Sequence, residues 1–85
     1  MIKKTYPQDY LQKLGRIGAL LKEYRLSYGY SQKELAEQLN MHRNTLSAAE
    51  RGGNLTLLNL IEITETLSID MHHLFHTVEN SNRGI

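Results

Sequence analysis

The middle of the chain carries helix-start and helix-stop signals in close succession, and this spacing limits the fold to short helices. Gly29 is typical of the position just past a helix. Ser31 and Glu34 form an S-x-x-E capping box, in which each side chain satisfies a free backbone donor of the other at a helix start. Asn40 accepts a left-handed backbone better than most residues, so it suits the end of that helix. The sequence therefore predicts one helix before Gly29 and a short, tightly capped helix after it.

The first helix is predicted from apolar residues at steps of three and four, which mark one helical face. These residues are Tyr10, Leu14, Ile17, Leu21, Tyr24 and Tyr28. Pro7 is tolerated in a first turn, whereas Gly15 and Gly18 each weaken a helix by about 1 kcal/mol relative to Ala. We therefore expect the regular helix to begin nearer Leu14 than Pro7.

Three further helical segments are expected after Asn40. The first runs from about Arg43 to Arg51 with Leu46 facing inward, and the sequence Gly52-Gly53-Asn54 stops it. Thr56 can cap the next helix, and Asp70 can cap a last short turn. The residues expected to be buried in the first of these two segments are Leu57, Leu60, Ile63, Thr64 and Leu67, and the last short turn carries Leu74 and Phe75.

The predicted fold class is all-α, a compact five-helix domain with a helix-turn-helix, and 85 residues fit one domain. Residues 1–13 are expected to form an N-terminal arm or helix extension, residues 14–76 the domain, and residues 77–85 a polar, mobile tail. The absence of cysteine excludes disulfides and thiolate metal sites. No apolar run approaches the ~18 residues that span a bilayer. The first residues have no apolar stretch typical of a secretion signal, so we expect a cytoplasmic protein with no membrane partner.

The net charge of +1 conceals an uneven distribution along the chain. Residues 1–51 contain nine Lys/Arg and five Asp/Glu, which gives +4, whereas residues 52–85 contain one and four, which gives −3. Such asymmetry suits a polyanion on one side of the molecule and something else on the other. Charge alone leaves open the alternative that these residues are merely unevenly scattered.

Two short helices joined by about four residues describe a helix-turn-helix. The segments SQKELAEQLNMHRNTLSAAERG and NLTLLNLIEITETLSIDMHHLF resemble the phage repressor and Cro type of this motif, the Xre family. Among its members the chain looks most similar to stand-alone regulators, namely controller proteins of restriction–modification systems and antitoxins of the HipB sort. The resemblance implies that the third helix lies in the major groove of double-stranded DNA. It also implies a homodimer that contacts two half-sites one DNA turn apart.

The outward face of the third helix supplies the candidate base-contacting residues Arg43, Asn44 and Ser47, with Thr45 near its entrance. Arginine can take guanine by two hydrogen bonds, asparagine can do the same to adenine, and threonine offers a hydroxyl and a methyl group. Ala48 replaces a side chain that often reaches bases in the family, so base contacts are expected to concentrate at Arg43 and Asn44. The alternative is a plain solvated face.

A second set of residues is expected to contact phosphates. The set is Gln32, Lys33, His42, Arg51 and the backbone of Gly52, Gly53 and Asn54. The family uses the glutamine on phosphate and to brace the first base-contacting residue, and a helix N-terminus adds backbone donors. His42 occupies the cap position before the third helix, where it weakens the helix start or touches a phosphate. For the glycines, turn geometry alone is the alternative.

Two structural contacts are also expected. The family pattern implies an ion pair between Arg25 and Glu50, which would tie the third helix to the first. The fourth helix is apolar on more than one face, and exposed apolar surface on a small domain suggests a partner subunit. The candidate dimer contacts are Leu58, Ile61, Met71 and Phe75. Local packing against the N-terminal arm or the last turn is the alternative.

The remaining chemistry-bearing residues predict no active site, cofactor or metal. His72, His73 and His76 are interpreted as exposed histidines, because no accompanying carboxylate motif completes a metal site. The acids are scattered, and no nucleophile–base arrangement is visible. We therefore predict a non-enzymatic, sequence-specific transcriptional regulator, a repressor by occupancy of its operator. Two alternatives stay open, an antitoxin that binds a toxin protein and represses its own operon, and a protein-interaction module without DNA binding.

Overall fold

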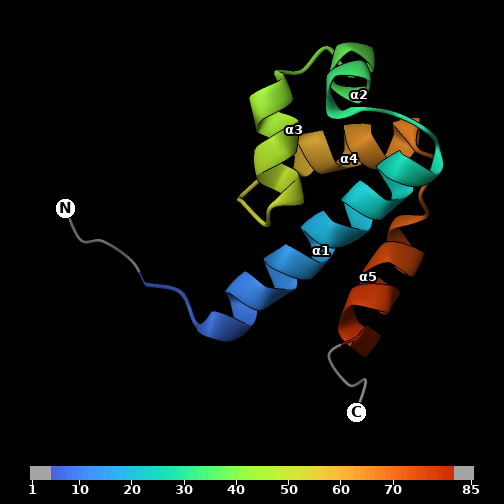
Figure 1. Cartoon of the computed structure of the whole chain (residues 1–85). Helices are drawn as coiled ribbons and strands as arrows, with labels where there is room; N and C mark the ends of the chain where they lie inside the picture. The colour runs from blue at the N-terminus through green and yellow to red at the C-terminus, as the bar shows by residue number, and fades with distance from the viewer. Residues whose placement is uncertain (1–4, 82–85) are drawn as a thin grey trace.

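The computed structural model describes residues 5–81, and it contains five α-helices over that part of the chain. The helices are α1 (Gln8–Ser27), α2 (Gln32–Gln38), α3 (Arg43–Glu50), α4 (Leu57–Thr66) and α5 (Met71–Ser81). Helix α3 packs against α2, and its C-terminal end packs against the middle of α1, whereas α5 lies alongside α1 (Figure 1). The all-α, five-helix prediction is therefore confirmed. Within residues 5–81, none of these helices has both the length and the apolar character needed to cross a membrane.

The helix starts follow the local signals of the sequence. The Ser31 hydroxyl accepts the Glu34 N–H at 3.0 Å, and the Glu34 carboxylate accepts the Ser31 N–H at 2.8 Å, which completes the expected capping box. Hydrogen bonds from Ser31, the larger effect from its backbone N–H and the smaller from its hydroxyl, hold the pKa of Glu34 below its ordinary value. The ionised Glu34 side chain therefore stabilises the folded state at pH values above the ordinary pKa of glutamate. This contribution to stability is lost as the pH falls through the lowered pKa. Thr56 and Asp70 accept backbone N–H groups at the starts of α4 and α5, as expected.

The first four helices all end in the same backbone arrangement. The second residue after each helix has a positive φ, 80° at Gly29, 53° at Asn40, 86° at Gly52 and 54° at Ser68. The following N–H then donates to a carbonyl five residues back, for example Met41 to Ala36 at 2.9 Å. This is the Schellman motif, which satisfies carbonyls left free at a helix end. The sequence indicated the first three stops, but serine at position 68 gave no such signal.

Three of the four connections have the same four-residue plan. Residues 28–31, 39–42 and 67–70 each supply the end cap, the positive-φ residue, the residue that bonds back, and the cap of the next helix. The connection between α3 and α4 follows the same plan with two additional residues, Asn54 and Leu55. The angles between successive helices are therefore set by hydrogen-bonded turns.

The core lies where all five helices meet. Its fully buried side chains include Leu21, Leu35, Leu46, Ile63, Leu67 and Leu74. The expected burial of Leu60 and Thr64 is also observed. Leu57 was wrongly expected to be buried, since its side chain is 68% exposed. It occupies the first position of α4, and the buried face of that helix is centred on Leu60, Ile63 and Leu67 instead. Phe75, next to the buried Leu74 on the last helix, is exposed.

The first helix begins at Gln8, earlier than expected, because its glycines are contact points rather than weak points. A Cβ added at Gly18 would lie 2.4 Å from the Ala49 carbonyl oxygen, so α1 passes directly against the C-terminal end of α3. A Cβ added at Gly52 would lie 2.8 Å from the Gly15 Cα. This close packing offsets the low helix propensity of glycine. Residues 8–13 are therefore a helix extension, not an arm.

The last helix continues beyond the expected boundary at residue 77. Val78 repeats the inward spacing of Met71 and Leu74 and is fully buried, so the helix gains core contacts as far as its third turn. The Lys13 ammonium and the Glu79 carboxylate lie 2.7 Å apart on the surface, between α1 and α5. The predicted mobile tail is wrong for residues 77–81, and residues 82–85 lie outside the described part of the chain.

The two glycines of α1 make a matched pair for a stability test. Gly18→Ala places a methyl group against the α3 carbonyls, so we expect the free energy of unfolding to fall by about 1–3 kcal/mol. Gly15→Ala meets no atom within 4 Å, and we expect it to raise that free energy by up to about 1 kcal/mol. Urea denaturation measures both, and a Gly18→Ala variant as stable as the parent would contradict the close approach.

Candidate nucleic-acid interface

A buried ion pair joins α1 to α3 beneath the outward face of α3. The Arg25 Nε donates to Glu50 Oε2 at 2.6 Å, and Nη2 donates to Oε1 at 3.0 Å. The two side chains are only 6% and 3% exposed. The structure thus brings together the two residues that the family pattern pairs, in a bidentate geometry that holds both groups in one plane.

Two further hydrogen bonds extend this pair to α2. The Gln32 amide nitrogen donates to Glu50 Oε1 at 3.0 Å, and Arg25 Nη1 donates to the Tyr30 carbonyl oxygen at 2.7 Å. Every buried side-chain nitrogen and oxygen described has a hydrogen-bond partner. The Glu50 carboxylate therefore connects α1, the start of α2 and the end of α3, and it fixes their mutual orientation. Gln32, expected at a phosphate, uses its amide nitrogen within this network.

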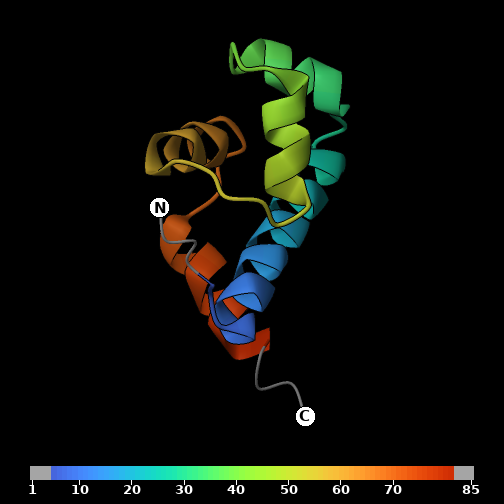
Figure 2. The same cartoon turned by 90° about the vertical axis from the view of Figure 1, so that its left-hand side faces the viewer.

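The first turn of α3 presents three exposed polar side chains. Arg43, Asn44 and Thr45 are all exposed, whereas Leu46 beneath them is fully buried. Ser47 is half-buried, and its hydroxyl accepts a hydrogen bond from the Arg51 guanidinium one turn later. Figure 2 looks onto α3, with α4 and α5 lying to one side of it. The accessible hydrogen-bonding groups of this helix are thus concentrated at its N-terminal end.

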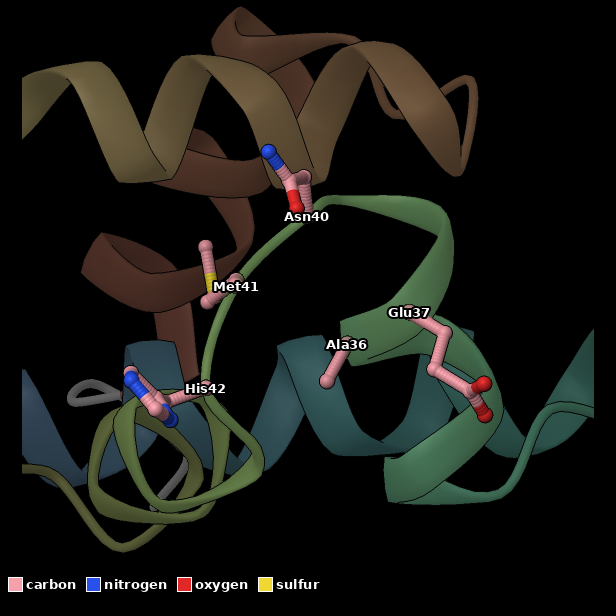
Figure 3. Close-up of a pocket in the computed structure, with 5 residues that line it drawn as sticks. All are labelled: Ala36, Glu37, Asn40, Met41 and His42. Carbon is pink, nitrogen blue, oxygen red and sulfur yellow. The ribbon is translucent and has the colours of Figure 1, made fainter.

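The turn before α3 contains His42, whose side chain makes no cap hydrogen bond. Its carbonyl oxygen accepts the N–H groups of Thr45 and Leu46 at 3.0 and 3.3 Å. His42 borders a hollow shared with Ala36, Glu37, Asn40 and Met41, in which His42 and Glu37 lie on opposite sides (Figure 3). The exposed imidazole therefore stands beside the N-terminal end of α3 without bracing it.

The residues expected at phosphates differ in what they leave accessible. Lys33 and Asn54 are exposed, and Arg51 keeps donors beyond the one given to Ser47. The Gly52 and Gly53 N–H groups donate to the carbonyls of Ala49 and Ala48 at 3.1 and 2.8 Å. These two glycines therefore serve the helix end, and their backbone donors are already used.

The residues expected at a dimer contact lie on the outer sides of α4 and α5. Leu58 is 66% exposed, Ile61 and Phe75 are also exposed, and Met71 is half-buried. Leu57, which sequence reasoning assigned to the core, adds to this apolar surface. The sequence contained a sign of this exposure, because Leu57 is a further apolar residue on a helix that is already apolar on more than one face.

The histidines of α5 form no metal cluster with other residues. The rings of His72 and His76 stack with centroids 6.1 Å apart, and His76 Nε2 lies 2.8 Å from the Asn80 amide nitrogen. Between residues 5 and 81, no three His, Cys, Asp or Glu side chains are grouped to hold a metal ion.

Sequence reasoning missed the role of Gly15 and Gly18, although two glycines three residues apart on one helix are a usable signal of close helix contact.

The geometry is that of a helix-turn-helix, and the helix-turn-helix family HTH_3 matches residues 21–74. The chain belongs to this family, and it is a DNA-binding transcriptional regulator. It is 34% identical over 62 residues to YgzD, an uncharacterised HTH-type transcriptional regulator of Bacillus subtilis (strain 168). The aligned residues make up 72% of this chain and 94% of YgzD. The fold is similar to that of a mutant of the restriction–modification controller protein C.Esp1396I, with a TM-score of 0.70 and 28% identity over 81% of this chain and 89% of that chain.

The buried ion pair can be tested by removing its acid. Glu50→Ala strands the Arg25 guanidinium in the core, so we expect the free energy of unfolding to fall by about 3–5 kcal/mol. Glu37→Ala removes an exposed carboxylate of α2 and serves as the control, with an expected change within about 0.5 kcal/mol. Equal melting temperatures for the Glu50→Ala variant and the parent would contradict a stabilising role for the pair.

Proposed function

We propose that the protein binds operator half-sites as a homodimer, with α3 in the major groove and α2 across the DNA backbone. The observation that carries this proposal is the exposed first turn of α3, held at a set angle by the buried contacts of Glu50. A protein that discriminates bases needs side chains placed within hydrogen-bonding distance of base edges, and a rigidly held helix meets that need.

Arg43 and Asn44 are assigned to base edges in this proposal, and Thr45 assists at the entrance of the helix. A guanidinium suits the two acceptors of guanine, and a carboxamide suits the donor–acceptor pair of adenine. Ser47 is the fourth candidate. Its hydroxyl already accepts a hydrogen bond from Arg51, so we assign it a smaller contribution to base contacts.

Phosphate contacts are assigned to Lys33, His42, Arg51 and Asn54, with the Gln32 side-chain oxygen as a further group. Lys33 and His42 precede α3 in the chain, Arg51 and Asn54 follow it, and all except Gln32 are exposed. Such contacts position the protein on DNA without selecting a sequence. Gly52 and Gly53 then act by shaping the turn that carries Asn54.

Dimerisation is assigned to the apolar surface of α4 and α5, formed by Leu58, Ile61, Met71 and Phe75. The net charge of residues 52–85 is −3, which favours an orientation of this surface away from DNA. A two-fold interface allows the patch to meet its own copy. Occupancy of the operator by such a dimer would repress transcription in the cytoplasm, with no catalytic step.

Base contacts and phosphate contacts are separable by mutation. We expect Arg43→Ala and Asn44→Ala each to relax preference at one position per half-site, by about 1–3 kcal/mol of discrimination. Lys33→Ala should weaken binding to all sequences alike and reduce the salt slope by about one unit. Binding of selected and random duplexes at several salt concentrations measures these effects. Unaltered DNA binding in both α3 variants would contradict the proposal and favour the interaction-module alternative.

The dimer surface can be tested with a charge. Leu58→Glu places a carboxylate at the centre of the proposed contact, so we expect monomers and weaker operator binding without unfolding. Glu65→Gln, on the same helix, is the control, and it should leave the dimer intact. Sedimentation of the parent as a monomer at micromolar concentration would contradict this assignment.

A further inference from the structure

The beginning of α1 lies on the same side of the molecule as α3. In Figure 1 both are on the left, and in Figure 2 both therefore face the viewer, with the start of α1 below the C-terminal end of α3. Residues 5–20 also lie outside the segment that matches the family, residues 21–74.

A hollow connects this segment to the turn after α3. Tyr6, Tyr10, Leu11 and Leu14 line one side of it, and residues 52–54 line the other. The two sides are held rigidly, because the Gly52 backbone packs against Gly15 so closely that an added Cβ would lie 2.8 Å from its Cα. The hollow is thus a direct continuation of the helix-turn-helix surface beyond the C-terminal end of α3.

The chemistry of the hollow suits a sugar–phosphate backbone. Tyr6 and Tyr10 are both exposed, with Tyr10 61% exposed, and a tyrosine combines an apolar ring with a hydroxyl donor. A deoxyribose offers apolar surface to such a ring, and a phosphate accepts from such a hydroxyl.

We propose that the start of α1 and the turn at residues 52–54 bind the DNA backbone beside the half-site that α3 contacts. Tyr10 supplies the ring and hydroxyl contacts, the exposed Tyr6 ring adds to them, and Asn54 lines the same hollow. The proposal rests on the proposed docking of α3 in the major groove. It extends the bound DNA by the phosphates adjacent to each half-site, independently of their sequence.

The test uses the full chain and duplexes enriched from a random pool by the parent protein. Binding of the Tyr6→Ala/Tyr10→Ala double variant is compared with that of Tyr28→Ala, which removes a 56% exposed tyrosine at the opposite end of α1. We expect the double variant to lose roughly threefold to tenfold in affinity, the effect of a few hydrogen bonds and contacts. Tyr28→Ala should bind as the parent does.

Ethylation of individual phosphates locates the effect. In the parent, ethylation beside the half-site should interfere with binding, and this interference should disappear in the double variant while that along the half-site persists. An unchanged affinity and interference pattern in a folded double variant would overturn the proposal, and so would a loss of dimers with intact flanking interference. If the double variant unfolds, Tyr10→Ala alone carries the same test. Failure of α3 docking would instead remove interference along the half-site in the parent itself.

Discussion

The Glu50 carboxylate is the group on which the arrangement of the DNA-binding surface depends. It accepts hydrogen bonds from Arg25 on α1 and Gln32 on α2, while its own backbone lies against Gly18 of α1. A buried charge is costly unless it is paired and fully hydrogen-bonded, so few arrangements of these three helices are acceptable. An apolar contact in the same place would tolerate sliding and rotation, because hydrophobic burial is not directional. The angle at which α3 projects is therefore set by polar geometry within an otherwise apolar core.

The sequence predicted well those features that neighbouring residues determine. The capping box at Ser31, the stops at Gly29 and Asn40 and the outward face of α3 all depend on signals within one or two turns. Prediction from the sequence failed where contacts between distant segments determine the length of a helix. The early start of α1 depends on backbone contacts between Gly18 and α3, and the long α5 depends on the burial of Val78. In the site, the exposure of Arg43 followed from the helical periodicity of the sequence. The hydrogen bonds of the Gly52 and Gly53 N–H groups to the end of α3 did not follow from the sequence, because they depend on the path of the backbone.

The polar face of α3 is short. Exposed side chains occupy its first turn, Ser47 is bound to Arg51, and Ala48 carries no hydrogen-bonding group. One helix of this kind discriminates few base pairs, so a proposed operator complex would derive its selectivity from two half-sites and from contacts to the backbone around them. Rigid mounting then has a clear benefit, because contacts outside the major groove improve selectivity only when they cannot shift independently of α3.

The repeated four-residue connections have a consequence for how such a chain can change in length. In the turns at 28–31, 39–42 and 67–70, every residue fills a defined position of a helix end or a helix start. An insertion or deletion there would remove a cap or a helix-end hydrogen bond. If the next helix supplied or absorbed the residue instead, its buried face would shift by about 100°, the angle per residue of an α-helix. The α3–α4 connection differs, since Asn54 and Leu55 lie outside the shared plan. Within the five-helix body, length polymorphism among relatives should therefore gather at this loop, while the other turns diverge by substitution alone.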